Sequence, residues 1–390
     1  MIDFLVFDTF TIVFSAVILI IAVLACFFTP YVRYRREDGE DAVVSEVPSL
    51  SVILTPHDEA DKLEVCLPLL LRQNYPAGFQ VIVVIEEGEH ETEDLVKRIQ
   101  GELSDKPGDG SLYMTYIPDS SRYMSRKKLA MTLGVKAAKT EWVLFTEPYS
   151  RPSSDEWLLT MAQRCSEGTD MVIGYGNYEE TTPAFKRFER LNMAYYLMRE
   201  DTKGIAYTTL SHNILLRKSL FMEQEGFRGN LELIRGEYDF LVNKYATETG
   251  TVLVTNHEAW MTDDEPSRKT WLNKHIFYAE TRKTLSRSGR HRVWFNVDQI
   301  ALHASLMLIV SGIVFGALAM NLVVLAAAAI ALIASWVVRS CMGFKAMKRF
   351  DEYIPFLAIY PFQLSLVWHN LNYLIRHRFA DKLDFTTHKQ

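Results

Sequence analysis

The stretch SRKKLAMTLGVKAAKTEWVLFTEPYSRP, residues 125–152, decides the fold that we expect for this chain. Small side chains recur at helical spacing in its first half, which predicts a helix over residues 125–139 with one narrow, close-packing face. The apolar run EWVLFT, residues 141–146, then predicts a short buried strand. Ligands of an open α/β sheet bind beyond the carboxyl ends of its strands, so we expect a ligand to lie against Glu147 and Tyr149.

The same alternation of strands and helices extends from Leu50 to about Asp264. Residues 81–85 are continuously apolar, which is typical of a parallel strand that is buried on both faces. This β-α-β-α-β order predicts an α/β fold with a doubly wound, mostly parallel, Rossmann-like sheet. The predicted strands are residues 50–55, 81–85, 114–117, 141–146 and 171–175, and the predicted helices are residues 60–72, 93–102, 125–139 and 157–165.

The charge and the cysteines argue against several classes of function. The net charge is −6 at pH 7 and the chain has no basic low-complexity arm, which is unlike a nucleic-acid-binding protein. The four cysteines form no CxxC pair and have no histidine at metal-binding spacing. We therefore expect neither a disulfide framework nor a structural zinc site, and reduced thiols suit a cytoplasmic domain.

An N-terminal membrane anchor is expected from the uncharged apolar run Phe10–Phe28. Its length suffices to cross a hydrocarbon core of about 30 Å. A cleaved signal peptide is the rival interpretation, but acidic residues stand where its basic region would be and no A-x-A-like site follows. The positive-inside rule places the basic residues after the run in the cytoplasm and the N-terminus outside. These basic residues are Arg33, Arg35 and Arg36.

Two further apolar runs, Ile300–Met320 and Leu322–Val338, predict a transmembrane hairpin with a minimal external turn at Asn321. Basic residues between 339 and 349 then return the chain to the cytoplasmic face. Residues 354–374 are a fourth candidate, which polar residues weaken, so that it either spans the membrane or forms an interfacial or re-entrant helix. A buried hairpin in a soluble protein is the alternative for all of these runs.

Several ordered blocks of the sequence resemble family 2 glycosyltransferases. SVILTPHDEADKLEVCLPLLLRQNYPAGFQVIVVIEEG, residues 51–88, is similar to the family's opening, and residues 125–158 match its Lys-bearing helix and the strand that ends in D-x-D. SHNILLRKSLFMEQEGF, residues 211–227, and GEYDFLVN, residues 236–243, are similar to its later segments. The resemblance covers about residues 50–271. It implies a GT-A domain that binds a nucleotide sugar and, in membrane-attached members, an acceptor at the bilayer surface.

The resemblance also implies the chemistry of the site. A divalent cation, Mg²⁺ or Mn²⁺, held by paired carboxylates neutralises the charge of the nucleotide diphosphate leaving group. An inverting transfer further needs a carboxylate that takes a proton from the acceptor hydroxyl. Glu86 or Glu87 would contact the base or ribose, and Lys127 and Lys128 are the candidates for the phosphates. For each of these charged residues, the alternative interpretation is a solvated side chain on the surface. The expected nucleotide contacts are Thr55, Pro56, His57, Glu59, Glu86 and Lys128.

Three family motifs are altered. Glu147-Pro148-Tyr149 replaces D-x-D and leaves Glu147 as the expected metal ligand. Tyr238 stands where the family has its base, and the flanking Glu237 and Asp239 are the remaining candidates, although neighbours on a helix point about 100° apart. Q-x-x-R-W is represented after Trp271 only by Lys274 and the residues that follow it. The expected acceptor contacts are Tyr149, Tyr238, Trp271 and Lys274.

Two segments connect the α/β domain with the membrane. Residues 271–295 mix aromatic and basic side chains, which favours an interfacial position against anionic headgroups over a solvated surface. Residues 184–200 form an amphipathic helix that either lines an acceptor groove or packs in the core. The expected organisation is an N-terminal transmembrane anchor (1–36), a linker (37–48), the glycosyltransferase-like domain (49–270), an interfacial amphipathic segment (271–299), C-terminal transmembrane helices (300–375) and a tail (376–390).

Two functions follow from these patterns. The first is an integral protein of the inner or plasma membrane whose cytoplasmic domain transfers a sugar from a nucleotide-sugar donor, with inversion, to a lipid-linked or glycan acceptor. The second is a catalytically inactive glycosyltransferase-like protein that binds a nucleotide, a glycan or a partner subunit at the membrane. A purely structural membrane adaptor is a third interpretation. The retained acidic residues Glu147, Glu237 and Asp239 favour the enzyme.

Overall fold

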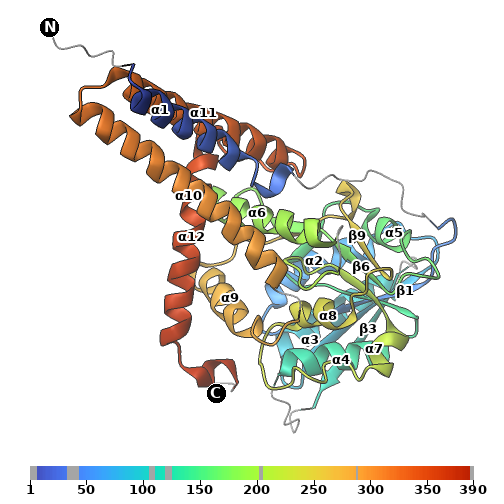
Figure 1. Ribbon diagram of the computed structural model, residues 1–390. Coiled ribbons are helices and arrows are strands. Elements are labelled where there is room, and N and C mark those ends of the chain that lie inside the picture. Colours follow the sequence, from blue (N-terminus) through green and yellow to red (C-terminus); the bar gives the residue numbers. More distant parts are fainter. Residues whose placement is uncertain are drawn as a thin grey trace. The chain divides into compact units, whose positions relative to one another are not determined.

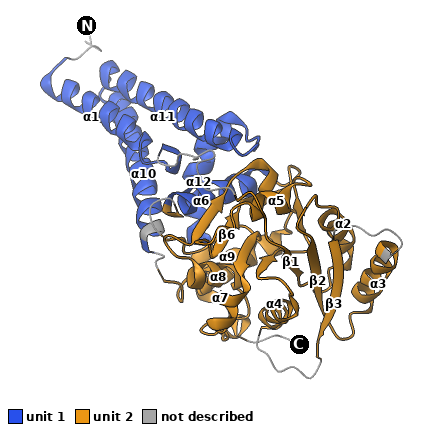
Figure 2. Cartoon of the chain, turned by 90° about the vertical axis from the view of Figure 1, so that its right-hand side faces the viewer, with its two compact units in different colours: residues 1–35, 183–199, 289–372 blue, residues 36–182, 200–288, 373–390 orange. Residues whose placement is uncertain are grey.

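The computed structural model describes residues 7–32, 44–104, 110–118, 125–201, 205–286 and 289–386 (Figure 1). The predicted cytoplasmic flank at Arg33, Arg35 and Arg36 and most of the predicted linker lie outside these residues. The chain forms two compact units, which Figure 2 colours separately. Unit 1 comprises residues 1–35, 183–199 and 289–372, and unit 2 comprises residues 36–182, 200–288 and 373–390.

Unit 2 is built on a seven-stranded sheet with the strand order β3-β2-β1-β4-β8-β6-β9. Neighbouring strands are parallel except for β8, which runs antiparallel to both β4 and β6. The doubly wound, mostly parallel sheet predicted from the sequence is therefore confirmed. Its strands are β1 (Leu50–Leu54), β2 (Phe79–Glu86), β3 (Gly110–Ile117), β4 (Trp142–Phe145), β6 (Met171–Gly174), β8 (Ile214–Arg217) and β9 (Thr251–Val254).

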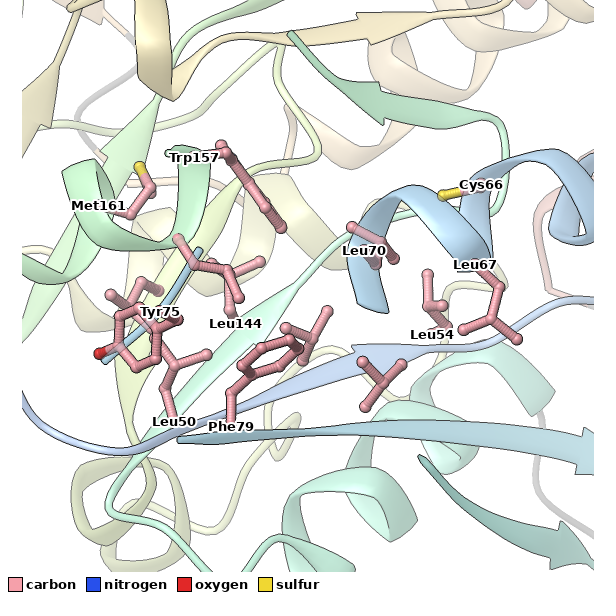
Figure 3. Close-up of a cluster of buried hydrophobic side chains, with 14 of the residues drawn as sticks. Leu50, Leu54, Cys66, Leu67, Leu70, Tyr75, Phe79, Leu144, Trp157 and Met161 are labelled. Atoms are coloured by element: carbon pink, nitrogen blue, oxygen red, sulfur yellow. The ribbon is translucent and has the colours of Figure 1, made fainter. Parts of the chain in front are cut away.

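Helices cover both faces of this sheet because the strands are apolar on both sides. In β1, Leu50 and Leu54 belong to one buried cluster and Ile53 belongs to another (Figure 3 shows the first cluster). The first cluster includes side chains of α2 (Ala60–Leu71), α3 (His90–Ser104) and α5 (Trp157–Ala162). The second includes side chains of α4 (Arg126–Ala137), α7 (Lys218–Glu223) and α8 (Glu237–Tyr245).

Gly134 explains why α4 presents a narrow face to the sheet. A Cβ atom at this position would lie 2.5 Å from Cγ2 of Ile53 in β1, so only a glycine permits this close approach. Ser125 begins the helix, because its side chain accepts a hydrogen bond from the backbone N–H of Lys128. The helix and the following strand are thus as the sequence predicts, and they fix the position of Glu147.

Strands β8 and β9 and a second sheet were not predicted from the sequence. This three-stranded sheet has the order β5-β10-β7 and comprises β5 (Ser150–Pro152), β7 (Gly176–Tyr178) and β10 (Met261–Asp263).

The first eleven residues of the predicted interfacial segment belong to α9 (Arg268–Thr281) in unit 2, whereas residues from 289 onward belong to α10 in unit 1. Short 3-10 turns occur at Pro30–Val32, His257–Ala259 and Lys382–Phe385.

Unit 1 contains three helices that are long and apolar enough to cross a membrane, counted over the described residues. They are α1 (Thr9–Cys26), α10 (Gly289–Leu318) and α11 (Leu322–Lys348). The fourth candidate forms α12 (Phe356–Phe379), which does not belong to this set because polar residues interrupt its apolar face. Helix α6 (Ala184–Asp201) is largely buried, which favours its interpretation as a core-packing helix.

A buried polar network centred on Arg339 joins the helices of unit 1. The guanidinium is 1% exposed and donates to Oδ1 of Asp298 at 2.8 Å, to Oε1 of Gln363 at 2.6 Å and to the carbonyl of Ala25 at 2.9 Å. The hydroxyl of Tyr196 donates to the other carboxylate oxygen of Asp298 at 2.9 Å. One ion pair thereby connects α1, α6, α10, α11 and α12, and we call this set the Arg339 network.

Candidate functional site

The loops after β1 and β4 meet because these strands are parallel neighbours, with Leu50 paired to Trp142. Lys127 of α4 joins the two loops. Its Nζ lies 2.5 Å from Oε2 of Glu147 and donates to the carbonyl of Thr55 at 3.2 Å. Glu147 is 3% exposed and Lys127 is 26% exposed, so one end of this pair faces solvent. The structure thus brings Thr55 and Glu147 together, with Lys127 rather than Lys128 between them.

Glu59, the residue before α2, is the second carboxylate near this pair. Burial raises the pKa of Glu59, and the negative charge of Glu147 raises it further, whereas Lys127 lowers it. The charge of Glu147 acts on Glu59, so the two carboxylates lie near each other, and carboxylate oxygens are the ligands that hard divalent cations prefer. Glu147 and Glu59 are therefore the candidate ligands of the expected metal, and Lys127, which is paired with Glu147, carries positive charge at the same place.

A second polar group lies at the ends of β1 and β2. Nδ1 of His57 lies 3.0 Å from Oε1 of Glu89 and 3.5 Å from Oε1 of Glu86, and Nε of Arg126 donates to Oε2 of Glu86 at 2.6 Å. The hydrogen bond with Glu89 raises the pKa of His57. The ligand atoms of the three residues His57, Glu86 and Glu89 lie within 4.8 Å of one another, a spacing that can hold a metal ion. Pro56 is buried in the same loop.

Lys128 has a different environment from Lys127. Its side chain is fully buried, and its Nζ donates to the carbonyl and the side-chain oxygen of Asn230, both at 2.7 Å, and to the carbonyl of Leu233. Burial lowers the pKa of Lys128 to about 8. The ammonium group thus anchors the segment before α8, and the structure does not bring it to Glu147.

Tyr149 and Tyr238 both contact the ring of a histidine. The ring centroid of His212 is 5.4 Å from that of Tyr149 and 4.8 Å from that of Tyr238, both in edge-on arrangements. Burial, with the charge of Glu147 and a hydrogen bond to it, raises the pKa of Tyr238 well above its usual value. Tyr149 and Tyr238 therefore belong to one aromatic cluster, which borders Glu147.

Gly236 sets the direction in which α8 leaves the preceding loop. Its φ angle of +91° is in the left-handed region, and a Cβ atom there would lie 2.5 Å from Cγ2 of Thr281. A residue with a side chain would be strained at this point and would also push α9 away. The glycine thus fixes the start of the helix that carries Tyr238.

His212 was not predicted as a site residue. It precedes β8, and because β8 is antiparallel its beginning, at Ile214, pairs with Phe145 at the end of β4. Nδ1 of His212 lies 3.2 Å from Oδ2 of Asp263, a buried carboxylate whose other oxygen accepts a 2.5 Å hydrogen bond from Oγ of Ser150. The apolar run ILLR after SHN was the signal in the sequence that could have indicated this strand.

The two acidic residues beside Tyr238 have separate surroundings. The Thr208 hydroxyl donates a hydrogen bond to Asp239. Burial raises the pKa of Asp239 to about 6, the charge of Lys274 lowers this pKa and the charge of Glu237 raises it. Glu237 is buried, and its charge raises the pKa of Lys128. The pKa of Tyr238 is raised by burial and by Glu147 and Tyr149. This difference agrees with the expectation that neighbouring helical residues point in different directions.

Trp271 and Lys274 both lie on α9. The ring of Trp271 contacts the rings of His275, at a centroid distance of 5.1 Å, and Tyr373, at 5.6 Å. Nζ of Lys274 lies over the ring of Tyr178 at 5.7 Å from its centroid. The electrostatic effect of Lys274 on Asp239 connects this helix with α8, whereas Trp271 packs against the aromatic residues at the end of α12.

The likeness to solved structures identifies the type of fold. No protein-family model and no curated protein matches the chain. A mannosyltransferase from Pyrobaculum calidifontis, solved in complex with GDP-mannose and Mn²⁺, superposes with a TM-score of 0.51 at 15% identity, over 93% of this chain and 97% of that one. TarS from S. aureus, solved with and without UDP-GlcNAc, gives TM-scores of 0.42 and 0.41 at 14% and 15% identity, over 82% of this chain and 92% of the other. The chain has a glycosyltransferase fold.

Proposed function

We propose that this protein is a membrane-bound, family 2-like glycosyltransferase with a GT-A domain, which transfers a sugar from a nucleotide-sugar donor with inversion. The observation that carries the proposal is the Lys127–Glu147 pair. It combines a buried carboxylate with a partly exposed ammonium group at the edge where the parallel strands β1 and β4 end. Ligands of such sheets bind beyond this edge, and a diphosphate requires positive charge there.

The residues around the Lys127–Glu147 pair have proposed roles in binding the nucleoside, the metal and the phosphates of the donor. Thr55, Pro56, His57 and Glu86 follow β1 and β2, and we assign them to the nucleoside. Glu147, together with Glu59, would hold Mg²⁺ or Mn²⁺, which supplies positive charge to the leaving diphosphate. Lys127 contributes charge to the same phosphates, and Lys128 is left out of this assignment because its ammonium group is fully buried.

The acceptor is proposed to be lipid-linked or a glycan. Helices α1, α10 and α11 would anchor the chain, with the N-terminus outside and the transferase domain in the cytoplasm next to the inner or plasma membrane. Tyr149, Tyr238, Trp271 and Lys274 are the proposed acceptor contacts. Asp239 and Glu237 are candidates for the base. The raised pKa of Asp239, about 6, lies near the value that suits proton transfer at neutral pH.

The proposal is tested by calorimetric titration of the full chain in detergent with GDP-mannose, UDP-GlcNAc and UDP-glucose, with and without Mn²⁺. We expect metal-dependent binding of one donor and its slow hydrolysis by water. Glu147→Gln should reduce this hydrolysis by roughly 100-fold, because one carboxylate of the metal site is lost. Glu248→Gln, at an exposed turn, is the control with normal turnover. Hydrolysis that is unaffected by Glu147→Gln would show that the metal site lies elsewhere.

A catalytically inactive donor-binding protein is the second candidate. The observation that favours it is the replacement of two family carboxylates by Tyr149 and Tyr238, of which Tyr238 is held neutral by burial. The same titration separates the two functions. An inactive binder would bind the donor without releasing the nucleotide, whereas the enzyme releases it.

A further inference from the structure

We infer that His212, oriented by Asp263, takes the proton from the acceptor in place of the candidate bases Asp239 and Glu237. This inference rests on the function proposed above and names a residue that the family motifs do not indicate. Tyr238 stands where the family has its base, and a phenol, with an ordinary pKa of about 10, is a poor proton acceptor at neutral pH. The imidazole of His212 packs edge-on against this phenol ring, at a centroid distance of 4.8 Å.

The surroundings of His212 have the arrangement that a general base requires. Asp263 is 2% exposed, and its carboxylate faces Nδ1 of the imidazole at 3.2 Å. A carboxylate accepts hydrogen bonds, so Nδ1 carries the proton of the neutral ring and Nε2 retains its lone pair. The Ser150 hydroxyl fixes the other oxygen of Asp263. The imidazole of His212, the carboxylate of Asp263 and the hydroxyl of Ser150 thus form a connected chain of hydrogen bonds.

The position of His212 is fixed by the backbone as well as by Asp263. Asn213 is fully buried and its side chain donates to the carbonyl of Ala259 at 2.8 Å, while Nε1 of Trp157 donates to its side-chain oxygen at 3.2 Å. The backbone carbonyl of Asn213 accepts a hydrogen bond from Gly174 at 2.8 Å. The imidazole itself is 15% exposed, so it is held on a rigid segment and still reaches solvent.

The proposed step is a single displacement. The acceptor oxygen forms a bond to the anomeric carbon of the sugar while the bond from that carbon to the diphosphate oxygen breaks, and the nucleoside diphosphate leaves with the bonding electron pair. The acceptor proton moves to Nε2 of His212. The resulting imidazolium is stabilised by Asp263, which remains ionised and acts as a positioning residue. The rings of Tyr149 and Tyr238 both pack edge-on against the imidazole.

The test uses the full chain in detergent, with hydrolysis of GDP-mannose, UDP-GlcNAc and UDP-glucose as the assay and water as the acceptor. His212→Asn keeps an N–H donor toward Asp263 but has no basic nitrogen. We expect it to bind the donor as tightly as the unmodified chain and to lose roughly 100-fold in kcat. His212→Ala should lose a similar factor, and added imidazole should restore at least about 10-fold. Asp263→Asn should lose about 10-fold or more without restoration by imidazole, because the ring would then take the wrong tautomer.

His257→Ala removes an exposed histidine outside this cluster and is the matched control, which imidazole should not affect. A normal kcat in His212→Asn would overturn the inference. So would a complete loss of hydrolysis in Asp239→Asn together with undiminished hydrolysis in His212→Ala. Binding of a donor without any turnover by the unmodified chain would also overturn it while leaving the donor site intact. Absence of donor binding would instead contradict the proposed function itself.

Discussion

The Arg339 network of unit 1 and the cluster around Glu147 and His212 in unit 2 are both built from buried charges, but they differ in how their partners are used. Arg339 and Asp298 are 1% and 3% exposed, and they bond to each other and to further groups of the same unit, which include Ala25, Tyr196 and Gln363. In unit 2, Lys127 is 26% exposed and His212 is 15% exposed, although each is paired with a carboxylate that is almost fully buried.

This difference separates a structural network from a candidate site. An ion pair enclosed within helices that can cross a membrane has no access to a ligand, so its main effect is to hold the helices in one arrangement. A pair with one partly exposed member can exchange a protein contact for a ligand contact. The two networks should therefore respond differently to mutation.

The largest effect is expected at Arg339. Arg339→Leu leaves the carboxylate of Asp298 buried without its cation, which should lower the free energy of unfolding by about 3–5 kcal/mol. The double variant Arg339→Leu/Asp298→Leu removes both charges and should recover most of this loss. Thermal unfolding in detergent measures both variants. A double variant that is no more stable than the single one would contradict this expectation.

The neighbouring lysines provide the next comparison. Lys128→Met leaves the oxygen atoms of Asn230 and the carbonyl of Leu233 without their donor, and should cost about 2–3 kcal/mol of stability with little change in donor affinity per folded molecule. Lys127→Met leaves the buried carboxylate of Glu147 without its cation and should cost a similar amount of stability. It should, however, weaken donor binding, which titration detects. The opposite pattern would return the phosphate role to Lys128.

A smaller effect concerns pH. Asp298 is paired with a guanidinium, whereas Asp239 accepts a hydrogen bond from the neutral hydroxyl of Thr208. Burial raises the pKa of Asp239 from 3.8 to about 6, so its contribution to stability is complete below pH 4 and is lost as the pH rises through 6. Between pH 4 and 6 the melting temperature of Asp239→Asn should therefore fall less than that of the unmodified chain. Parallel curves would contradict the buried, neutral carboxyl.

The smallest effect is expected at Ser150. Ser150→Ala removes the hydrogen bond to Asp263 but leaves the contact between His212 and Asp263 in place. One hydrogen bond contributes about 0.5–1.5 kcal/mol to stability, and donor hydrolysis should fall only a few-fold. Steady-state kinetics distinguish this result from a loss as large as that of Asp263→Asn. An equal loss would mean that the hydroxyl, and not the carboxylate alone, determines the orientation of the ring.

The sequence predicts the parts of the fold that depend on local pattern. The close-packing face of α4, the buried strand β4 and the position of Glu147 at its end follow from periodicity, because parallel strands end at a common edge. The pairing of His212 with Asp263 could not be predicted, since it depends on the antiparallel direction of β8 and on the contact between β5 and β10. The choice between Lys127 and Lys128 also needs the structure, because adjacent helical residues point about 100° apart.

The reversed direction of β8 has a consequence for how the site tolerates change. Strand β8 is hydrogen-bonded on both sides, to β4 and to β6, so a slip of its register by one residue would turn His212 to the opposite face of the sheet and also disturb two neighbouring strands. Insertions in the loops after β1 and β2 carry no such penalty. Substrate range can therefore change through those loops over evolutionary time, while the proton acceptor stays tied to the integrity of the whole sheet.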